Sequence, residues 1–250
     1  SIDLSGGGVI LLVNYCISSG TFPGASPWFF VVLALAIGLS VGLINGLMVG
    51  WRRVSAVIAT LAISIILVGI VQYFASGKPP GDVPGAFNDV YGISFGPLPL
   101  PVFFWIILTV VTWLFLSRSV FGRFVASVGE NPSAAHFSGV PVERTVIFAH
   151  TAAGLFAALA ALVQTASIAV GSVRIGLDLP ILAVAATVLG GVVFGRGEGG
   201  VWGPFFGVLS FAFLFVTMTT FGIDEPGKLV AQGLIILLAA IFYGIRGKSN

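Results

Sequence analysis

Long apolar runs, separated by short polar or glycine-rich stretches, make up almost the whole chain of 250 residues. A helix that crosses a membrane needs about 20 mostly apolar residues, and fewer where other helices bury it. Eight runs fit this description, the first and sixth being short: residues 5–20, 28–50, 54–75, 101–117, 145–166, 180–194, 201–221 and 228–245. The pattern predicts an all-α, polytopic transmembrane helix bundle of about eight spans.

The composition supports a membrane protein and excludes several other classes. Apolar residues make up 57% of the chain and charged residues only 8%, whereas soluble domains carry roughly a quarter charged residues. The net charge of +2 is too small to indicate nucleic-acid binding. Cys16 is the single cysteine, so neither an internal disulfide nor a cysteine-based metal site is expected. No metal-ligand cluster is visible, and we expect no metal or cofactor on this chain.

The basic residues are distributed unevenly between the two sets of loops that eight spans would create. One set holds Arg52, Arg53, Arg118, Arg123, Arg144, Arg196, Arg246 and Lys248, and the other holds Lys78, Arg174 and Lys228. Cytoplasmic loops are enriched in lysine and arginine, so the first set is assigned to the cytoplasm. The assignment predicts a multi-pass protein of the cytoplasmic membrane with a cytoplasmic C-terminus.

No linker interrupts the apolar pattern, so we expect residues 1–250 to form a single transmembrane domain. Two longer loops stand out. The external loop 76–100 is rich in proline and glycine, which indicates a turn-rich connection and not a separate domain. The cytoplasmic loop 118–144 is basic and polar.

Small and polar residues within the spans predict how the helices pack. Glycines recur every four residues in the second span, at Gly38, Gly42, Gly46 and Gly50, which places them on one helix face. Close approach through small residues is a main source of contact between membrane helices. Isolated polar residues, among them Asn14 and Asn45, are expected to make interhelical hydrogen bonds. His150 is expected to bond a neighbouring carbonyl or Thr151.

The centre of the cytoplasmic loop carries the signals of a short helix. Asn131 is placed as the N-cap, Pro132 occupies the first helical position, and Gly139 is suited to end the helix. Two interpretations are open for this helix of about two turns. It is either an amphipathic helix at the membrane interface or a docking helix whose small side chains enter a groove on a partner.

The same loop carries a family resemblance. Residues 128–140, VGENPSAAHFSGV, resemble the coupling loop of ABC-importer permeases of the ribose/xylose/galactose type. The order and spacing of four further stretches agree: Ile2-Asp3-Leu4-Ser5, Gly42 to Val49, Ile58-Ala59-Thr60-Leu61, and Val188-Leu189-Gly190-Gly191 followed by the glycine-rich turn to Gly200. Family members usually have about ten helices. The chain begins without methionine, and we expect it to lack the first two helices of the family fold.

The resemblance implies a transport subunit that is not itself an enzyme. Two permease copies would form the pore in the lipid bilayer, a separate cytoplasmic ABC ATPase would drive it, and an extracytoplasmic solute-binding protein would deliver a small polar solute, in this family a monosaccharide. Residues matching the ATPase-coupling region are Glu130, Asn131, Ser133, Ala134, Ala135, Ser138, Gly139 and Arg144. Asp3, Ser5 and Asn45 are the candidates for the substrate pathway, and Lys78, Arg174 and Lys228 for contact with the binding protein.

Three alternatives remain at this point. The first is a permease for branched-chain amino acids or another small solute. The second is a passive channel or facilitator, and the third is a membrane-embedded enzyme. The third is disfavoured because ionisable residues do not cluster within the spans. Departures from the family pattern, such as Ser55-Ala56-Val57 where a proline pair is common and Glu198 where lysine or glycine is common, leave the substrate undetermined.

Overall fold

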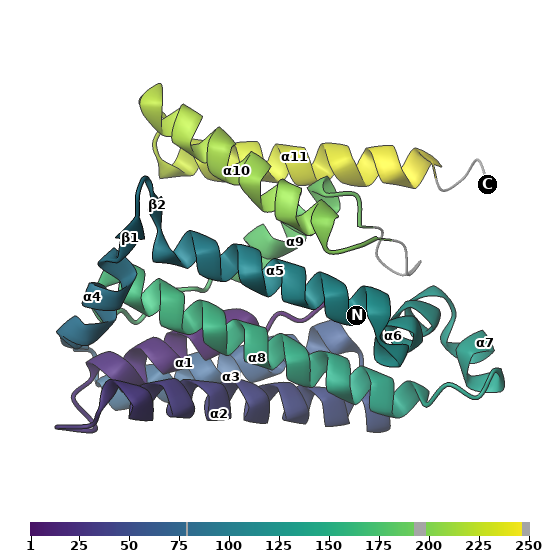
Figure 1. Cartoon of the computed structure of the whole chain (residues 1–250), viewed down its shortest axis with the longest axis horizontal. Helices are drawn as coiled ribbons and strands as arrows, with labels where there is room; N and C mark the ends of the chain where they lie inside the picture. The colour runs from purple at the N-terminus through teal and green to yellow at the C-terminus, as the bar shows by residue number, and fades with distance from the viewer. Residues whose placement is uncertain (79, 193–198, 247–250) are drawn as a thin grey trace. The chain divides into compact units, whose positions relative to one another are not determined.

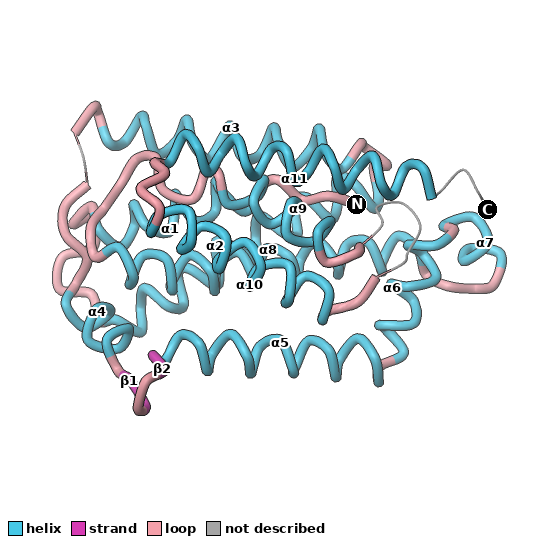
Figure 2. The backbone as a smooth tube through the Cα atoms, turned by 90° about the horizontal axis from the view of Figure 1, so that it is seen from above, coloured by secondary structure: helices cyan, strands magenta, loops and turns pink. Residues whose placement is uncertain are grey.

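A computed structural model describes the chain except for residue 79, residues 193–198 and residues 247–250. Two of the predicted cytoplasmic cations, Arg196 and Lys248, lie outside the described residues, as do Glu198 and the end of the predicted sixth span. Helix predominates throughout, and one two-stranded hairpin interrupts it (Figure 2).

A helix occupies each of the eight apolar runs. These helices are α1 (Gly6–Ser18), α2 (Pro27–Gly46), α3 (Ala56–Ala75), α5 (Leu100–Arg118), α8 (Val142–Ile168), α9 (Leu179–Leu189), α10 (Trp202–Thr220) and α11 (Glu225–Arg246) (Figure 1). Within the described residues, five helical segments are long and apolar enough to cross a membrane, namely Pro27–Trp51, α3, α5, α8 and α10. α1 and α9 are shorter apolar helices. The all-α, polytopic class is therefore confirmed, while the count of eight spans stays a prediction.

The contacts divide the chain into two compact units. The first unit comprises Ser1–Leu108 and Val140–Pro180, and the second comprises Thr109–Gly139 and Ile181–Asn250. α5 contributes to both units, because the boundary falls within it. Each unit is described below by itself.

Close backbone contact between α2 and α8 organises the first unit. A methyl group added at Gly42 would lie 2.5 Å from the carbonyl oxygen of His150, and one added at Gly46 would lie 2.7 Å from that of Ile147. At Gly38 and Gly154 each added methyl would collide with the other glycine's backbone. The predicted glycine face of α2 is thus confirmed as the surface on which α8 packs. Such contact is available only where side chains are absent.

Loop 76–100, which is predicted to be external, is more regular than its sequence suggests. It forms α4 (Gly85–Gly92) and a hairpin of β1 (Ser94–Phe95) with antiparallel β2 (Leu98–Pro99). Val83 N donates to the carbonyl of Ala169 at 3.2 Å, and Gly171 N donates to the carbonyl of Gly81 at 2.9 Å. These bonds fasten the loop to the segment that follows α8.

The second unit has a smaller core, in which small residues again bring two helices into close contact. Ala185 and Ala186 of α9 pack with Phe211 of α10. A methyl group at Gly207 would collide with the carbonyl of Ala186, and one at Gly190 would collide with Gly203. Small residues therefore allow α9 and α10 to approach each other closely.

Loop 118–144, which is predicted to be cytoplasmic, folds into two helices, α6 (Val120–Glu130) and α7 (Pro132–Phe137). The sequence reasoning predicted α7 but missed α6. Phe121, Phe124, Val125 and Val128 are more shielded than the intervening Arg123, and their three- and four-residue spacing is the signal that was available. Ser119 caps α6 by accepting a hydrogen bond from Gly122 N at 2.9 Å.

Candidate functional site

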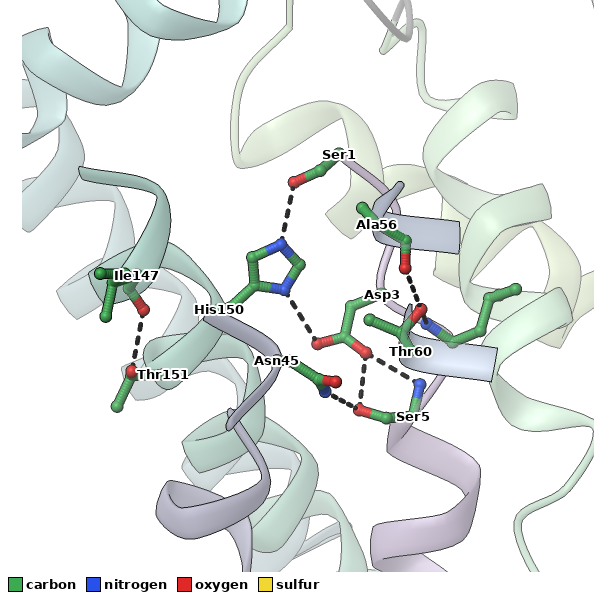
Figure 3. A network of polar contacts seen from close by, with 10 residues as sticks. Ser1, Asp3, Ser5, Asn45, Ala56, Thr60, Ile147, His150 and Thr151 are labelled. Atoms are coloured by element: carbon green, nitrogen blue, oxygen red, sulfur yellow. Dashed lines mark hydrogen bonds and ion pairs between the residues drawn. The ribbon is translucent and has the colours of Figure 1, made fainter. Parts of the chain in front are cut away.

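A buried polar cluster in the first unit joins four segments that are far apart in the sequence. Residues 1–5, which precede α1, run between α2, α3 and α8, and the side chains of these helices contact them (Figure 3). The cluster contains Asp3, Ser5 and Asn45, which are the three residues predicted for the substrate pathway. The structure therefore brings all three together, although this does not test their role.

Asp3 fixes the start of α1. Its Oδ1 accepts hydrogen bonds from Ser5 N at 2.8 Å and from Ser5 Oγ at 2.7 Å. This arrangement, in which an aspartate bonds a backbone amide two residues ahead, is typical of turns that lead into helices. A carboxylate at this position also interacts favourably with the N-terminal end of the helix dipole. The local sequence Asp3-Leu4-Ser5 thus both begins α1 and orients a carboxylate.

Three helices hold this segment in place. Asn45 of α2 donates from Nδ2 to Ser5 Oγ at 2.8 Å. Thr60 of α3 accepts from Leu4 N at 3.0 Å while its own hydroxyl donates to the carbonyl of Ala56 at 2.8 Å. Ser5, Asn45 and Thr60 are buried, so each of these bonds replaces a contact with water that burial has removed.

His150 of α8 completes the cluster, and its partner differs from the one expected. Its Nδ1 lies 3.5 Å from Asp3 Oδ2, and its Nε2 lies 3.3 Å from Ser1 Oγ. Thr151, the expected partner, instead donates to the carbonyl of Ile147 at 2.8 Å. The prediction for His150 was wrong because a contact across 147 positions depends on the packing of α8, which periodicity does not specify.

The second candidate region is α7. Asn131 Oδ1 accepts from both Ser133 N and Ala134 N at 3.0 Å, which confirms it as the N-cap. Pro132 occupies the first helical position, and Gly139 follows the helix with φ of +82°, a conformation that favours glycine. The predicted short helix is therefore present, and it ends at Phe137.

The residues predicted for coupling differ in exposure. Glu130, Asn131, Ser133, Ala134, Ser138 and Gly139 are exposed, whereas only 4% of Ala135 is exposed. Phe137, which the sequence reasoning did not select, is 90% exposed. Aromatic residues, phenylalanine among them, are enriched in protein interfaces relative to the rest of the surface. Arg144 is exposed on the first turn of α8, which belongs to the other unit.

The external cations fall into two groups. Lys78 and Arg174 are exposed in the first unit, and Arg174 N donates to Ser172 Oγ at 3.2 Å. Lys228 belongs to the second unit, where its Nζ lies 3.3 Å from Glu225 Oε2. The predicted contact of the three cations with the binding protein stays a prediction.

Across the described part of the chain, no group of three or more histidine, cysteine, aspartate or glutamate residues is placed to hold a metal ion. The two candidate regions thus consist of a buried polar cluster among helices and an exposed, capped helix between two long apolar helices. Together with five segments able to span a membrane, they describe a multi-pass membrane protein.

Comparison with known proteins identifies the family. Residues 2–240 match the family described as "Branched-chain amino acid transport system / permease component". The chain belongs to this family of permease components.

Curated relatives include sugar and signal-molecule permeases. The chain is 30% identical to the ribose import permease protein RbsC of Escherichia coli (strain K12) over 245 residues, which cover 96% of this chain and 76% of the relative. It is 30% identical to the galactose/methyl galactoside import permease protein MglC of Haemophilus influenzae, covering 86% and 67%. It is 29% identical to the autoinducer 2 import system permease protein LsrD of Photorhabdus temperata, covering 84% and 65%. No solved structure matches the chain.

Family membership defines what the chain does in general terms. It is a multi-pass permease subunit of an ABC importer in the bacterial inner membrane, and it works with an ABC ATPase and a solute-binding protein. ATP hydrolysis resides on the separate ATPase subunit, so the chain is a transport component and not an enzyme.

Proposed function

We propose that the chain is the permease subunit of an importer whose solute is a monosaccharide, such as ribose or galactose. The observation that carries this proposal is the similarity to the ribose import permease over 96% of the chain. The galactose/methyl galactoside relative supports the same chemical class. A buried cluster of carboxylate, hydroxyl, amide and imidazole groups suits a neutral polyhydroxylated solute, because each hydroxyl both donates and accepts hydrogen bonds.

We propose that α7 is the helix through which the ATPase moves this subunit. The helix is rigidly capped at Asn131, and Phe137 supplies an exposed aromatic anchor for a groove on the partner. Ser133, Ala134 and Ser138 surround that anchor as small exposed side chains, and Glu130, Gly139 and Arg144 flank the helix. Ala135 supports α7 from its buried side, so it contributes by holding the helix in position.

The remaining topology is also part of the proposal. All eight apolar helices span the bilayer, the C-terminus is cytoplasmic, and residues 1–250 form a single transmembrane permease domain without a cofactor of its own. Two copies assemble around one pathway that includes Asp3, Ser5 and Asn45. Lys78, Arg174 and Lys228 lie on the external side and attract acidic groups of the binding protein.

Uptake by cells tests the substrate class. The chain is expressed with its ATPase and binding protein in a strain that lacks its own ribose, galactose and branched-chain amino-acid importers. We expect accumulation of radiolabelled D-ribose or D-galactose that competes with the unlabelled sugar. Accumulation of L-leucine with no uptake of either sugar would overturn the proposal in favour of the amino-acid alternative.

A further inference from the structure

Asn45 presents a buried hydrogen-bond acceptor that nothing in the described protein satisfies. The residue is fully buried, and its Oδ1 has no hydrogen-bond partner. A buried acceptor left without a donor is costly, so such atoms in native proteins point to a function or to a bound group.

The hydrogen-bond network determines which way the amide of Asn45 points. Ser5 has a single hydroxyl proton, and it donates that proton to the Asp3 carboxylate at 2.7 Å. Ser5 Oγ can therefore only accept from Asn45, which must present its Nδ2 at 2.8 Å. A reversed amide would set two oxygen lone pairs against each other. Oδ1 consequently faces away from Ser5 as an open acceptor.

The surroundings of this acceptor are polar and lie on more than one element. Figure 3 shows the Asn45 amide beside the Asp3 carboxylate, with the His150 ring on the other side of that carboxylate. The side chain of His150 is 3% exposed and that of Asp3 is 17% exposed, while Asn45 is fully buried. Asp3 is therefore the most exposed of these three side chains.

The chemistry of the trio selects the kind of group that fits. Asn45 Oδ1 requires a donor, the Asp3 carboxylate accepts hydrogen bonds, and a histidine ring nitrogen either donates or accepts. A hydroxyl group meets the requirement of Asn45 Oδ1, because it can donate its single proton there. The Asp3 carboxylate and the ring nitrogens of His150 already have partners within the cluster. A metal cation fits less well, because Asp3 Oδ1 already accepts two hydrogen bonds from Ser5.

We propose that Asn45, beside the Asp3 carboxylate, recognises one hydroxyl group of the transported sugar inside the permease by accepting its proton at Oδ1. The inference rests on the proposed function, since it takes the sugar from there. It goes further by assigning a step of substrate selection to this chain in addition to the binding protein. A trapped water molecule can donate to Asn45 Oδ1 in the same way as a sugar hydroxyl. The experiments below distinguish a sugar hydroxyl from water at this position.

The wild-type transporter supplies the first test. Proteoliposomes containing the complete importer are given saturating binding protein loaded with D-ribose or D-galactose, whichever wild type imports, or with each monodeoxy analogue of that sugar. Saturation removes differences in affinity for the binding protein, so the rate reports the permease. We expect one analogue to enter about tenfold more slowly than the parent sugar, as the loss of one buried hydrogen bond predicts. Equal rates for all analogues would overturn the inference and indicate water only.

The variant Asn45→Leu supplies the second test, with Asn14→Leu as its control. Asn14 is equally buried in the first unit, but its Oδ1 accepts from Ser172 N at 2.9 Å and its Nδ2 bonds Thr165 Oγ1. We expect Asn45→Leu to import the parent sugar as slowly as the discriminated analogue, which removes the difference between them. Asn14→Leu should retain the tenfold difference even if its yield is lower.

The outcomes distinguish this inference from the proposed function. If wild type imports neither D-ribose nor D-galactose, the proposed function fails. If wild type imports the sugar and Asn45→Leu retains the full discrimination against the analogue, the inference alone fails. If Asn45→Leu does not fold, the wild-type comparison of analogues still decides the question.

Discussion

The two units of the chain bury different kinds of side chain. The first unit buries a series of polar residues, Ser5, Asn14, Ser18, Asn45, Thr60, Thr145, His150 and Thr165, whereas the buried polar residues described in the second are Thr109 and Gln232. The first unit also has the larger apolar core. Polar groups inside a membrane bundle are costly and are retained mainly for specific contacts or function. The difference accords with our proposal that the first unit contacts the solute, whereas the proposed role of α7 in partner contact rests on its exposed residues.

The largest expected effect concerns the tight contact in the first unit. Gly154→Ala should lower the stability of the folded protein by about 3 kcal/mol, because the added methyl collides with the backbone of Gly38 and Gly42. Gly69→Ala is the control, since nothing lies within 4 Å of that position. Thermal unfolding in detergent measures both. Equal melting temperatures for the two variants would show that the α2–α8 contact does not organise this unit.

The next effect tests the docking role of the second unit. Phe137→Ala should weaken binding of the ATPase by about 2 kcal/mol, or roughly thirtyfold, because an exposed aromatic anchor is removed. The melting temperature should not change, because the ring is 90% exposed. Co-purification with the ATPase and uptake are the measurements. Unchanged binding would remove Phe137 from the interface.

Ala135→Glu serves as the comparison for Phe137→Ala. Because Ala135 is buried, a glutamate there should disrupt the packing of α7 and weaken ATPase binding indirectly. We expect loss of co-purification while α1, α2 and α8 of the first unit stay folded, as judged by the proteolysis pattern. Retained ATPase binding and uptake in this variant would contradict the coupling role of α7.

A smaller effect concerns the polar cluster of the first unit. Asp3→Asn should destabilise the protein by about 1–2 kcal/mol and slow uptake, because the amide replaces the charged acceptor that faces Ser5 and His150. Asp89→Asn on the exposed α4 is the matched control and should behave as wild type. If both variants transport at the wild-type rate, the cluster is not part of the pathway.

The smallest effect concerns the ion pair between Arg53 and Glu143, whose side chains are largely exposed and 3.5 Å apart. Exposed pairs contribute about 0–1 kcal/mol, so Arg53→Gln should change the melting temperature little at physiological salt. A large loss of stability in this variant would mean that the pair is less accessible to solvent than the structure shows.

The sequence predicted the features that depend on local chemistry. Apolar run length located the eight apolar helices, glycine spacing located the packing face of α2, and Asn131 with Gly139 located α7. These predictions succeeded because each depends on residues within a few positions of one another. The family resemblance also led to the hypothesis that Asp3, Ser5 and Asn45 belong to the substrate pathway. The structure places these three residues together.

Features that depend on packing at long range were not predictable in this way. His150 meets Asp3 only because α8 lies against α2 with a particular rotation. The burial of Ala135 and the exposure of Phe137 depend on which face α7 presents, and six residues are too few for periodicity to decide that. α6 is different, because its Ser119 cap and its apolar spacing are local signals that predict a helix, and these signals were overlooked.

The most direct test of the account is whether transport requires energy from a separate ATPase. Proteoliposomes containing the permease are prepared with and without the ATPase, with loaded binding protein outside and ATP inside, and sugar accumulation is measured against a concentration gradient. The account predicts accumulation only when both the ATPase and ATP are present. Equilibration of the sugar across the membrane at the same rate without the ATPase would contradict it and would establish a passive facilitator.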